Sequence, residues 1–150
     1  MSNIADILAS FELDASWQRR LYEHLHANPE LGFEEEKTSA LVIRELRALG
    51  LEVHTGLGGT GVVAVIDSGA PGLSIGLRAD MDALPMDEDS DLPFRSQRPG
   101  VAHTCGHDGH TSALLGTARH LAAHPPATGR VVLIFQPAEE GGRGAIRMIE

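Results

Sequence analysis

The sequence predicts an α/β fold, a three-layer sandwich in which a mixed central sheet is flanked by helices. Two observations lead to this prediction: the runs come in the order helix, helix, strands, loop, helix, strand, and the last strand-like run is continuously apolar, as in a strand covered on both faces. With 150 residues, of which 42% are hydrophobic, the chain has the size and apolar content of one ordinary domain with its own core. One domain is therefore the expected organisation.

Helical periodicity predicts two helices in the first third of the chain. Apolar residues recur at helical spacing over residues 14–26, and Asn28-Pro29 closes this run. A second helix is expected over residues 35–49, with Gly50 in the place of the residue after the C-cap. Both have the pattern of ordinary core-packing helices.

Three apolar runs have the character of strands. Residues 61–66 and 73–79 are joined by a segment rich in Gly and Pro, which predicts a turn between antiparallel strands. Residues 130–135 form a continuous apolar run, typical of a strand covered on both faces. Such runs of four to eight residues between turn signals are too short for most helices.

The remaining segments predict a loop and two more helices. Residues 87–100 are polar, contain Pro and lack periodicity, so we expect a surface loop. Apolar positions within residues 114–122 indicate a helix, for which Asp108 is the expected N-cap. A last helix is expected to begin near Gly144.

Charge and apolar patterning exclude several classes of protein. The formal net charge of -9 argues against nucleic-acid binding, since such proteins use clustered Lys and Arg to displace counterions. The N-terminus lacks the basic start and apolar stretch of a signal peptide, and no run approaches membrane-spanning length. We therefore expect a soluble cytoplasmic protein with neither nucleic acid nor membrane as a partner.

The segment HTCGHDGH, residues 103–110, packs three His, one Asp and the only Cys of the chain together. A single cysteine cannot form an internal disulfide, so Cys105 is a buried apolar thiol, a metal ligand or a reactive group. In an extended segment, Cys105 and His107 at i and i+2 point to the same side. Thiolate and imidazole suit zinc and other late divalent metals, and a carboxylate such as Glu140 would complete the set.

Two other interpretations of this segment stay open. A buried cysteine beside solvated histidines is the more frequent meaning of Cys-x-His alone. A thiolate at Cys105, next to His107 or His103 at a helix N-terminus, could also be an activated nucleophile. The nucleophile interpretation identifies no residue that would orient the base, and it leaves the carboxylates that follow the strands without a role.

Those carboxylates form two pairs. Asp80 and Asp82 follow the run at 73–79, and Glu139 and Glu140 follow the run at 130–135. Most such pairs are solvated charges, but in open α/β folds ligands bind beyond the carboxyl ends of strands. A metal-activated water needs one carboxylate to hold metal and another, unliganded, to move protons. Two neighbouring glutamates can divide these tasks.

With these residues in place, the chain resembles the metal-dependent amidohydrolases that include hippurate hydrolases, N-acyl-amino-acid deacylases and plant auxin-conjugate hydrolases. The resemblance covers nearly the whole chain and rests on four stretches in the family's order. Thr104 and Arg143 depart from the family's pattern, but neither position is one of the family's site residues. The matching stretches are LHANPELGFEE at 25–35, GLRADMDALPM at 76–86, HTCGHDGHTSALLG at 103–116 and FQPAEEGGRGA at 135–145.

The resemblance implies a role for each site residue. Cys105, His107 and Glu140 would bind metal, Glu139 would be the general base, and Asp82 would be the acid that orients the metal site. It also implies two divalent metal ions per complete site, which can be zinc, manganese, cobalt or nickel. The implied reaction is hydrolysis of the amide bond of an N-acyl amino acid, in which Glu139 takes a proton from water and passes it to the departing amine.

The family's chains are longer than this one, and further histidine ligands and a lid and dimerisation domain lie downstream in them. We therefore expect residues 1–150 to be the N-terminal part of a metallohydrolase catalytic domain, inactive alone, from an enzyme that is a homodimer when complete. The alternative is a non-catalytic, small zinc-binding or interaction domain that has kept the motifs without the reaction.

Overall fold

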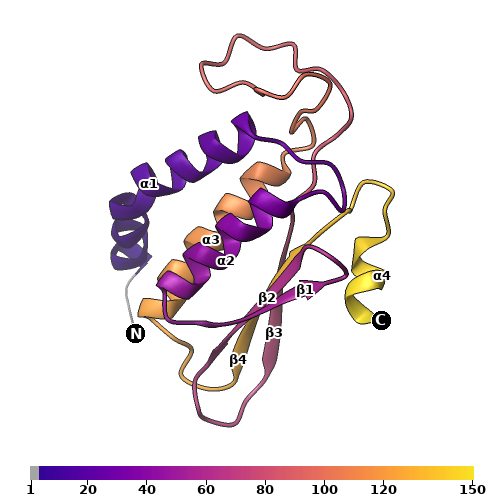
Figure 1. Cartoon of the computed structure of the whole chain (residues 1–150). Helices are drawn as coiled ribbons and strands as arrows, with labels where there is room; N and C mark the ends of the chain where they lie inside the picture. The colour runs from indigo at the N-terminus through magenta and orange to yellow at the C-terminus, as the bar shows by residue number, and fades with distance from the viewer. Residues whose placement is uncertain (1–3) are drawn as a thin grey trace.

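The computed structural model describes residues 4–150, with side chains from residue 15 onward. Figure 1 shows the helices of the N-terminal and middle parts of the chain grouped beside a sheet, with the C-terminal helix standing apart from them. The α/β class and the mixed sheet predicted from the sequence are confirmed. The elements in chain order are α1 (Ile4–Ala27), α2 (Glu36–Ala48), β1 (Glu52–Leu57), β2 (Gly61–Asp67), β3 (Ser74–Asp80), α3 (His107–Ala123), β4 (Arg130–Gln136) and α4 (Gly144–Ile149).

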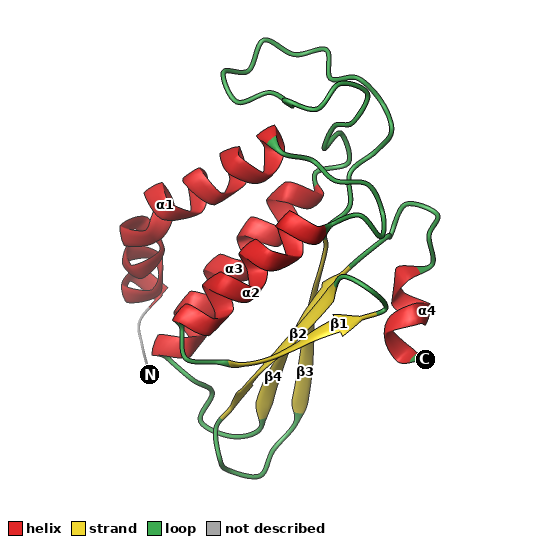
Figure 2. Ribbon diagram, in the orientation of Figure 1, coloured by secondary structure: helices red, strands yellow, loops and turns green. Residues whose placement is uncertain are grey.

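The four strands form one sheet in the order β1-β2-β4-β3 (Figure 2). β1 pairs with β2, and β2 pairs with β4, in antiparallel fashion. β3 runs parallel to β4, with Leu77 opposite Leu133 and Asp80 opposite Gln136. The carboxyl ends of β3 and β4 therefore lie at the same edge of the sheet.

The hairpin predicted between β2 and β3 is wrong, because β4 lies between these two strands. The apolar run of β4 is best buried with a neighbour on each side, whereas β3 is an edge strand whose Ile75 is 56% exposed. A turn signal shows where the chain reverses, but it does not tell whether a later strand inserts between the two arms. β1 was not predicted, because most of its residues are exposed and it lacks an apolar run.

The apolar core of the described residues lies between the sheet and helices α1, α2 and α3. Alternate residues of β4 face this core, as the period of two along a strand requires. On the other face of the sheet, Val132 and Ile134 are only half-buried. The core residues larger than alanine that are at most 2% exposed are Leu25, Val42, Leu46, Val62, Met81, Leu115, Leu133 and Phe135.

The helix predictions are confirmed in kind and corrected at their ends. α1 begins at Ile4, earlier than expected, while α2 and α4 begin within one residue of their predicted positions. Asp108 is not an N-cap, because α3 already begins at His107 and is preceded by Gly106 in a left-handed conformation, φ 89°. The Asp108 carboxylate is instead buried inside the first turn. Residues 87–100 form a loop, as predicted.

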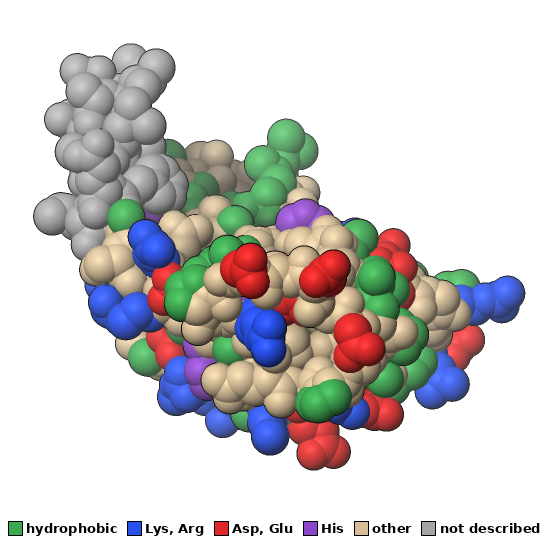
Figure 3. Space-filling view, turned by 90° about the horizontal axis from the view of Figure 1, so that it is seen from above, with side chains coloured by type: hydrophobic (Ala, Val, Ile, Leu, Met, Phe, Trp, Pro, Cys, Tyr) green, Lys and Arg blue, Asp and Glu red, His purple; other side chains and the backbone are tan. Residues whose placement is uncertain are grey.

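The surface bears mixed charge. Seen from above, the face in Figure 3 intersperses acidic with basic side chains rather than presenting one continuous basic surface.

Among residues 4–150, no helix has both the length and the apolar character needed to cross a membrane.

Leu133 tests the central position of β4. Its side chain is fully buried between helices and sheet, so Leu133→Ala should lower the free energy of unfolding by about 2–5 kcal/mol. Leu73→Ala is the matched control, because Leu73 is 84% exposed and should change stability by less than about 0.5 kcal/mol. Urea unfolding followed by circular dichroism measures both, and equal losses would contradict this placement of β4.

Candidate metal centre

The candidate metal centre forms where three segments of the chain meet. The parallel strands β3 and β4 end at a common edge of the sheet. Asp80 is the last residue of β3 and Asp82 follows it, while two glutamates follow β4. α3 begins beside this edge, and the Thr111 hydroxyl donates to the Asp80 backbone carbonyl over 2.9 Å. The side chains gathered here are Asp80, Asp82, Cys105, His107, His110, Glu139 and Glu140.

Cys105, His107 and Glu140 form one group able to hold a metal ion. Their sulfur, nitrogen and oxygen donors all lie within 4.8 Å of one another. His107 is 2% exposed, whereas Cys105 and Glu140 are open to solvent. Sulfur, imidazole and carboxylate donors are a set that zinc and its neighbours accept. The three residues singled out from the sequence as metal ligands are thus together.

The local backbone differs from the extended segment expected at Cys105 and His107. His107 is the first residue of α3, and the turn at Gly106 connects it to Cys105. Gly106 has the positive φ that glycine adopts at little cost. The two donors converge through this turn and not through strand geometry.

Asp82 orients His107. The His107 Nδ1 lies 2.9 Å from the Asp82 backbone oxygen and 3.2 Å from Asp82 Oδ1. Both partners are acceptors, so Nδ1 carries the proton and donates, which leaves the lone pair of Nε2 free to bind an ion. Metal-binding histidines are commonly held in this way by a carboxylate or carbonyl.

The same Asp82 carboxylate also holds the loop after β4, because its Oδ2 accepts the Glu140 backbone N–H over 2.9 Å. Burial by itself would raise the pKa of Asp82, but the hydrogen bonds from His107 and from the backbone at Glu140 and Glu139 outweigh it and lower that pKa. Asp82 is therefore an anion that joins two ligand-bearing segments.

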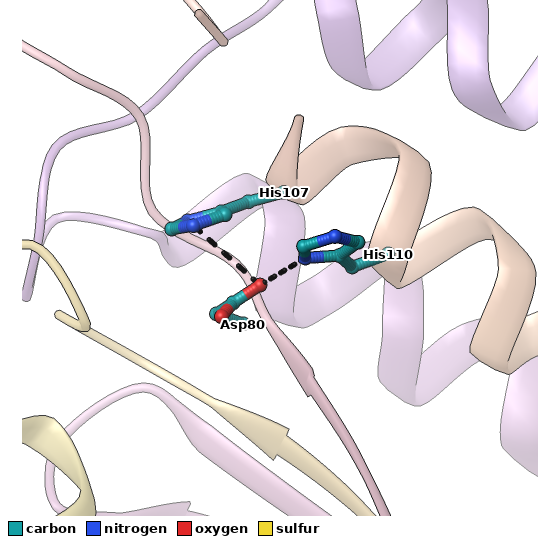
Figure 4. A group of neighbouring side chains, drawn as sticks. All are labelled: Asp80, His107 and His110. Atoms are coloured by element: carbon teal, nitrogen blue, oxygen red, sulfur yellow. Dashed lines mark hydrogen bonds and ion pairs between the residues drawn. The ribbon is translucent and has the colours of Figure 1, made fainter. Parts of the chain in front are cut away.

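Asp80 forms a second group with His107 and His110 (Figure 4). Its Oδ1 accepts the His110 Nδ1–H over 2.6 Å and lies 3.6 Å from His107 Nε2. His107 Nε2 belongs to both groups, and its single lone pair can serve only one ion. Arg78 Nη1 pairs with Asp80 Oδ2 over 3.0 Å, and its positive charge opposes a cation at this second group.

Sequence reasoning did not single out His110. The spacing could have revealed it: residues three apart on a helix lie on one face, and His110 follows His107 by three. The two rings stack with their centroids 5.6 Å apart. Asp80 was noted only as part of a carboxylate pair.

The surroundings of Cys105 oppose a free thiolate. A hydrogen bond with Glu140, burial and the negative charges of Glu140, Glu139 and Asp80 together raise the pKa of Cys105. A nucleophilic cysteine needs the opposite, a lowered pKa in positive surroundings. A divalent cation between these carboxylates would stabilise the thiolate, so the geometry and charge fit a metal ligand better than a nucleophile.

A buried ionic cluster, His26, Glu88 and Asp108, joins α1 to the start of α3 and to the long loop. His26 Nδ1 lies 2.6 Å from Asp108 Oδ2, and Nε2 lies 3.0 Å from Glu88 Oε1. Both partners are carboxylates, so an imidazolium can donate to both. Burial would lower the pKa of His26, but the hydrogen bonds to Glu88 and Asp108 raise it overall.

Glu88 holds the loop at residues 87–100 in place through two hydrogen bonds within that loop. It accepts the Ser90 hydroxyl and the Ser96 backbone N–H. Burial opposes ionisation of Glu88, but these hydrogen bonds and the one from His26 lower its pKa to about 2. No local pattern in the sequence indicates this cluster, because its members are 62 and 82 residues apart.

His103, the other histidine considered as a base for Cys105, has a different environment. It is 6% exposed, and neither ring nitrogen has a hydrogen-bond partner within the described part of the chain. Burial lowers the pKa of His103 to about 4, so its ring is neutral at pH 7. A buried neutral ring without a partner for either nitrogen is not set up to take a proton from Cys105.

The pKa of His26 predicts a pH-dependent stability. Its folded-state pKa lies above 6.5, so its contribution is fully present below pH 6.5 and is lost as the pH rises through the folded pKa. The difference in free energy of unfolding between wild type and His26→Gln should be largest in mild acid and shrink above neutrality. His54→Gln, at an exposed histidine of β1, is the control, and a difference independent of pH would contradict the charged state of His26.

Known proteins resemble this chain in sequence. The second half of the chain, residues 76–150, matches the model of Peptidase family M20/M25/M40. The chain is 47% identical over 147 residues to the hippurate hydrolase of Campylobacter jejuni, covering 98% of this chain and 36% of that protein. It is 45% identical over 145 residues to IAA-amino acid hydrolase ILR1-like 5 of Arabidopsis thaliana, covering 95% and 33%.

The fold is similar to that of the YXEP protein of Bacillus subtilis, described as a dinuclear metal binding peptidase from the M20 family. The TM-score is 0.86 at 38% identity, and the match covers 92% of this chain and 39% of that one. The chain thus spans about a third of the length of the curated relatives it matches. The resemblance inferred from the four sequence stretches is confirmed, and the chain belongs to peptidase family M20/M25/M40.

Proposed function

We propose that this chain supplies the metal-binding and proton-transfer residues of a metal-dependent amidohydrolase that cleaves N-acyl amino acids. The observation that carries the proposal is the convergence of Cys105, His107 and Glu140 at one point, with Glu139 alongside. His107 Nε2 lies 3.9 Å both from Glu140 Oε1 and from Glu139 Oε2. Adjacent glutamates from one loop thus face the same nitrogen, as a ligand and a base would.

Cys105, His107 and Glu140 would hold a divalent ion. Their donor types suit zinc, cobalt, nickel and manganese without selecting among them. Two ions per complete site are part of the proposal, supported by the dinuclear metal binding of the Bacillus neighbour. When bound, such ions polarise an amide carbonyl and lower the pKa of a water molecule.

The remaining steps belong to side chains of this chain. Glu139 is the proposed general base: its side chain is 40% exposed, so water and substrate can reach it. It accepts a proton from the attacking water and returns it to the nitrogen of the leaving amine as the amide C–N bond breaks. Asp82 keeps the His107 ring in the orientation in which Nε2 faces the ion.

The substrate class rests on the relatives. Hippurate and the conjugates of IAA with amino acids both join an acyl group to an amino acid through an amide, and proteins with these substrates in their names match nearly the whole chain. Because the chain spans about a third of these relatives, we propose that residues 1–150 form the N-terminal part of the catalytic domain. A homodimeric complete enzyme, implied by the resemblance, belongs to the same proposal.

Replacing the proposed base separates catalysis from metal binding. In the complete enzyme, Glu139→Gln should keep bound metal and lower the rate of amino-acid release from hippurate by at least about 10²- to 10⁴-fold, the usual worth of a general base. Metal content by atomic spectroscopy and turnover are measured together. Glu52→Gln, at a glutamate whose side chain is 83% exposed in β1, is the matched control.

Full turnover in the metal-loaded Glu139→Gln enzyme would remove Glu139 as the base. Metal binding without hydrolysis of any N-acyl amino acid by the wild-type enzyme would favour the alternative, a non-catalytic zinc-binding domain.

A further inference from the structure

The carboxylate of Glu35 is fully buried, with 0% exposure, yet it has no part in the proposed chemistry. It closes the stretch LHANPELGFEE, residues 25–35, which contains no proposed metal ligand or base. Burying a carboxylate is costly unless hydrogen bonds compensate for the lost water. The partners of Glu35 therefore indicate what this side chain does.

Glu35 joins two distant parts of the chain. Its Oε1 accepts the Ala138 backbone N–H over 2.8 Å, across 103 residues of sequence. Its Oε2 accepts the Thr60 hydroxyl over 2.6 Å, in the turn between β1 and β2. The Glu35 backbone carbonyl also accepts the Ser39 N–H over 2.9 Å, so the residue is held at the start of α2.

Ala138 is the point at which the chain leaves β4 and turns toward the metal centre. It has a φ of 47°, a left-handed conformation that alanine rarely adopts and that persists only where neighbours impose it. Both of its backbone polar groups are held, the N–H by Glu35 and the C=O by the Gly144 N–H over 3.1 Å. Glu139 and Glu140 follow directly.

A second buried carboxylate holds the other end of this short loop, since Asp82 accepts the Glu140 N–H. Residues 138–140 are thus fixed by one carboxylate at each end, and only Asp82 also contacts a proposed metal ligand side chain. Space is tight on the Glu35 side as well: a Cβ added at Gly32 would come within 3.0 Å of the Ala138 Cβ.

We propose that Glu35 is a positioning residue of the metal centre, which holds the Ala138 N–H and thereby places Glu140 as a ligand and Glu139 as the base. It touches neither ion nor substrate and acts through the backbone of the loop. This inference rests on the proposed function, because it takes Glu140 to be a metal ligand.

Four substitutions isolate this role. Glu35→Ala removes both hydrogen bonds, and Glu35→Asp keeps the charge but draws the carboxylate back by one methylene. Glu35→Gln can still accept from Ala138 with its amide oxygen and donate to Thr60 with its amide nitrogen. Thr60→Val is the matched control, since it removes only the contact at Oε2.

The complete enzyme loaded with Co²⁺ provides the measurement. The charge-transfer absorption from thiolate to cobalt reports the Cys105 bond, and the d–d bands report the number and arrangement of the other ligands. Glu35→Ala and Glu35→Asp should keep the charge-transfer absorption, change the d–d bands and weaken Co²⁺ binding by about 10- to 100-fold. Glu35→Gln and Thr60→Val should keep the wild-type d–d bands and bind Co²⁺ within about threefold of wild type, well short of such a loss.

Unchanged d–d bands and affinity in both Glu35→Ala and Glu35→Asp would overturn the role of Glu35. So would equal losses in all four variants, because the effect would then belong to the Glu35–Thr60 contact or to general destabilisation. If Glu35→Ala does not fold, as judged by circular dichroism, Glu35→Asp decides the question. If the wild type shows no charge-transfer absorption, and Cys105→Ala leaves the Co²⁺ spectrum unchanged, the proposed metal centre is overturned and this inference with it.

Discussion

The Asp82 carboxylate is the interaction on which the rest of the site depends. One oxygen accepts the ring N–H of His107, and the other accepts the backbone N–H of Glu140, so one buried anion at the end of β3 holds α3 and the loop after β4 together. This is possible only because β3 and β4 are adjacent and parallel, which brings their carboxyl ends to one edge. The parallel pairing of β3 with β4 is therefore a requirement of the site.

Around this anion, the four sequence stretches divide the work. Two of them supply the proposed ligands and the base, the stretch at 76–86 supplies Asp82 itself, and the stretch at 25–35 holds the neighbouring segments in place. The buried Glu30 carboxylate accepts the backbone N–H groups of Lys37 and Thr38 at the start of α2, and the Glu30 carbonyl accepts the Ala83 N–H over 2.8 Å. The segment before α2 is thereby tied to the chain that follows Asp82. Residues without any contact to a substrate can still determine where the reacting groups lie.

The electrostatic balance of the centre points to a cation. Several carboxylates surround one thiol and one buried imidazole, and they raise the pKa of both Cys105 and His107. For His107, burial acts against this rise and the hydrogen bond with Asp82 prevails. Like charges held this close repel one another, and a divalent ion is the simplest species that would relieve the repulsion while converting the thiol into a ligand.

Local patterns in the sequence predicted that the helices exist, though not all of their ends, and pointed to Cys105, His107 and Glu140 as one group. The roles expected for Glu139 and Asp82 came from the family resemblance, and His110 was missed. The helical spacing before Asn28-Pro29 and the apolar run of β4 each predicted an element that the structure contains. Patterns of this kind do not encode strand order, so the inserted β4 was missed, and β1 lacks the alternation that would have revealed it.

Contacts between distant parts of the chain were equally beyond sequence reasoning. The pairs Glu35–Ala138 and His26–Asp108 are 103 and 82 residues apart, and in each a buried charge meets a partner that no spacing rule links to it. Asp108 shows the limit in one residue: local rules favour a helix cap, and the tertiary partner His26 decides otherwise.

X-ray absorption at the zinc edge of the zinc-loaded protein tests directly whether Cys105 is a metal ligand. Cys105, His107 and Glu140 as the ligand group predict one sulfur at about 2.3 Å together with nitrogen and oxygen at about 2.0–2.2 Å. The competing group of Asp80, His107 and His110 contains no sulfur and uses the same His107 nitrogen. A first shell of nitrogen and oxygen alone would therefore contradict Cys105 as a ligand and place the ion at Asp80.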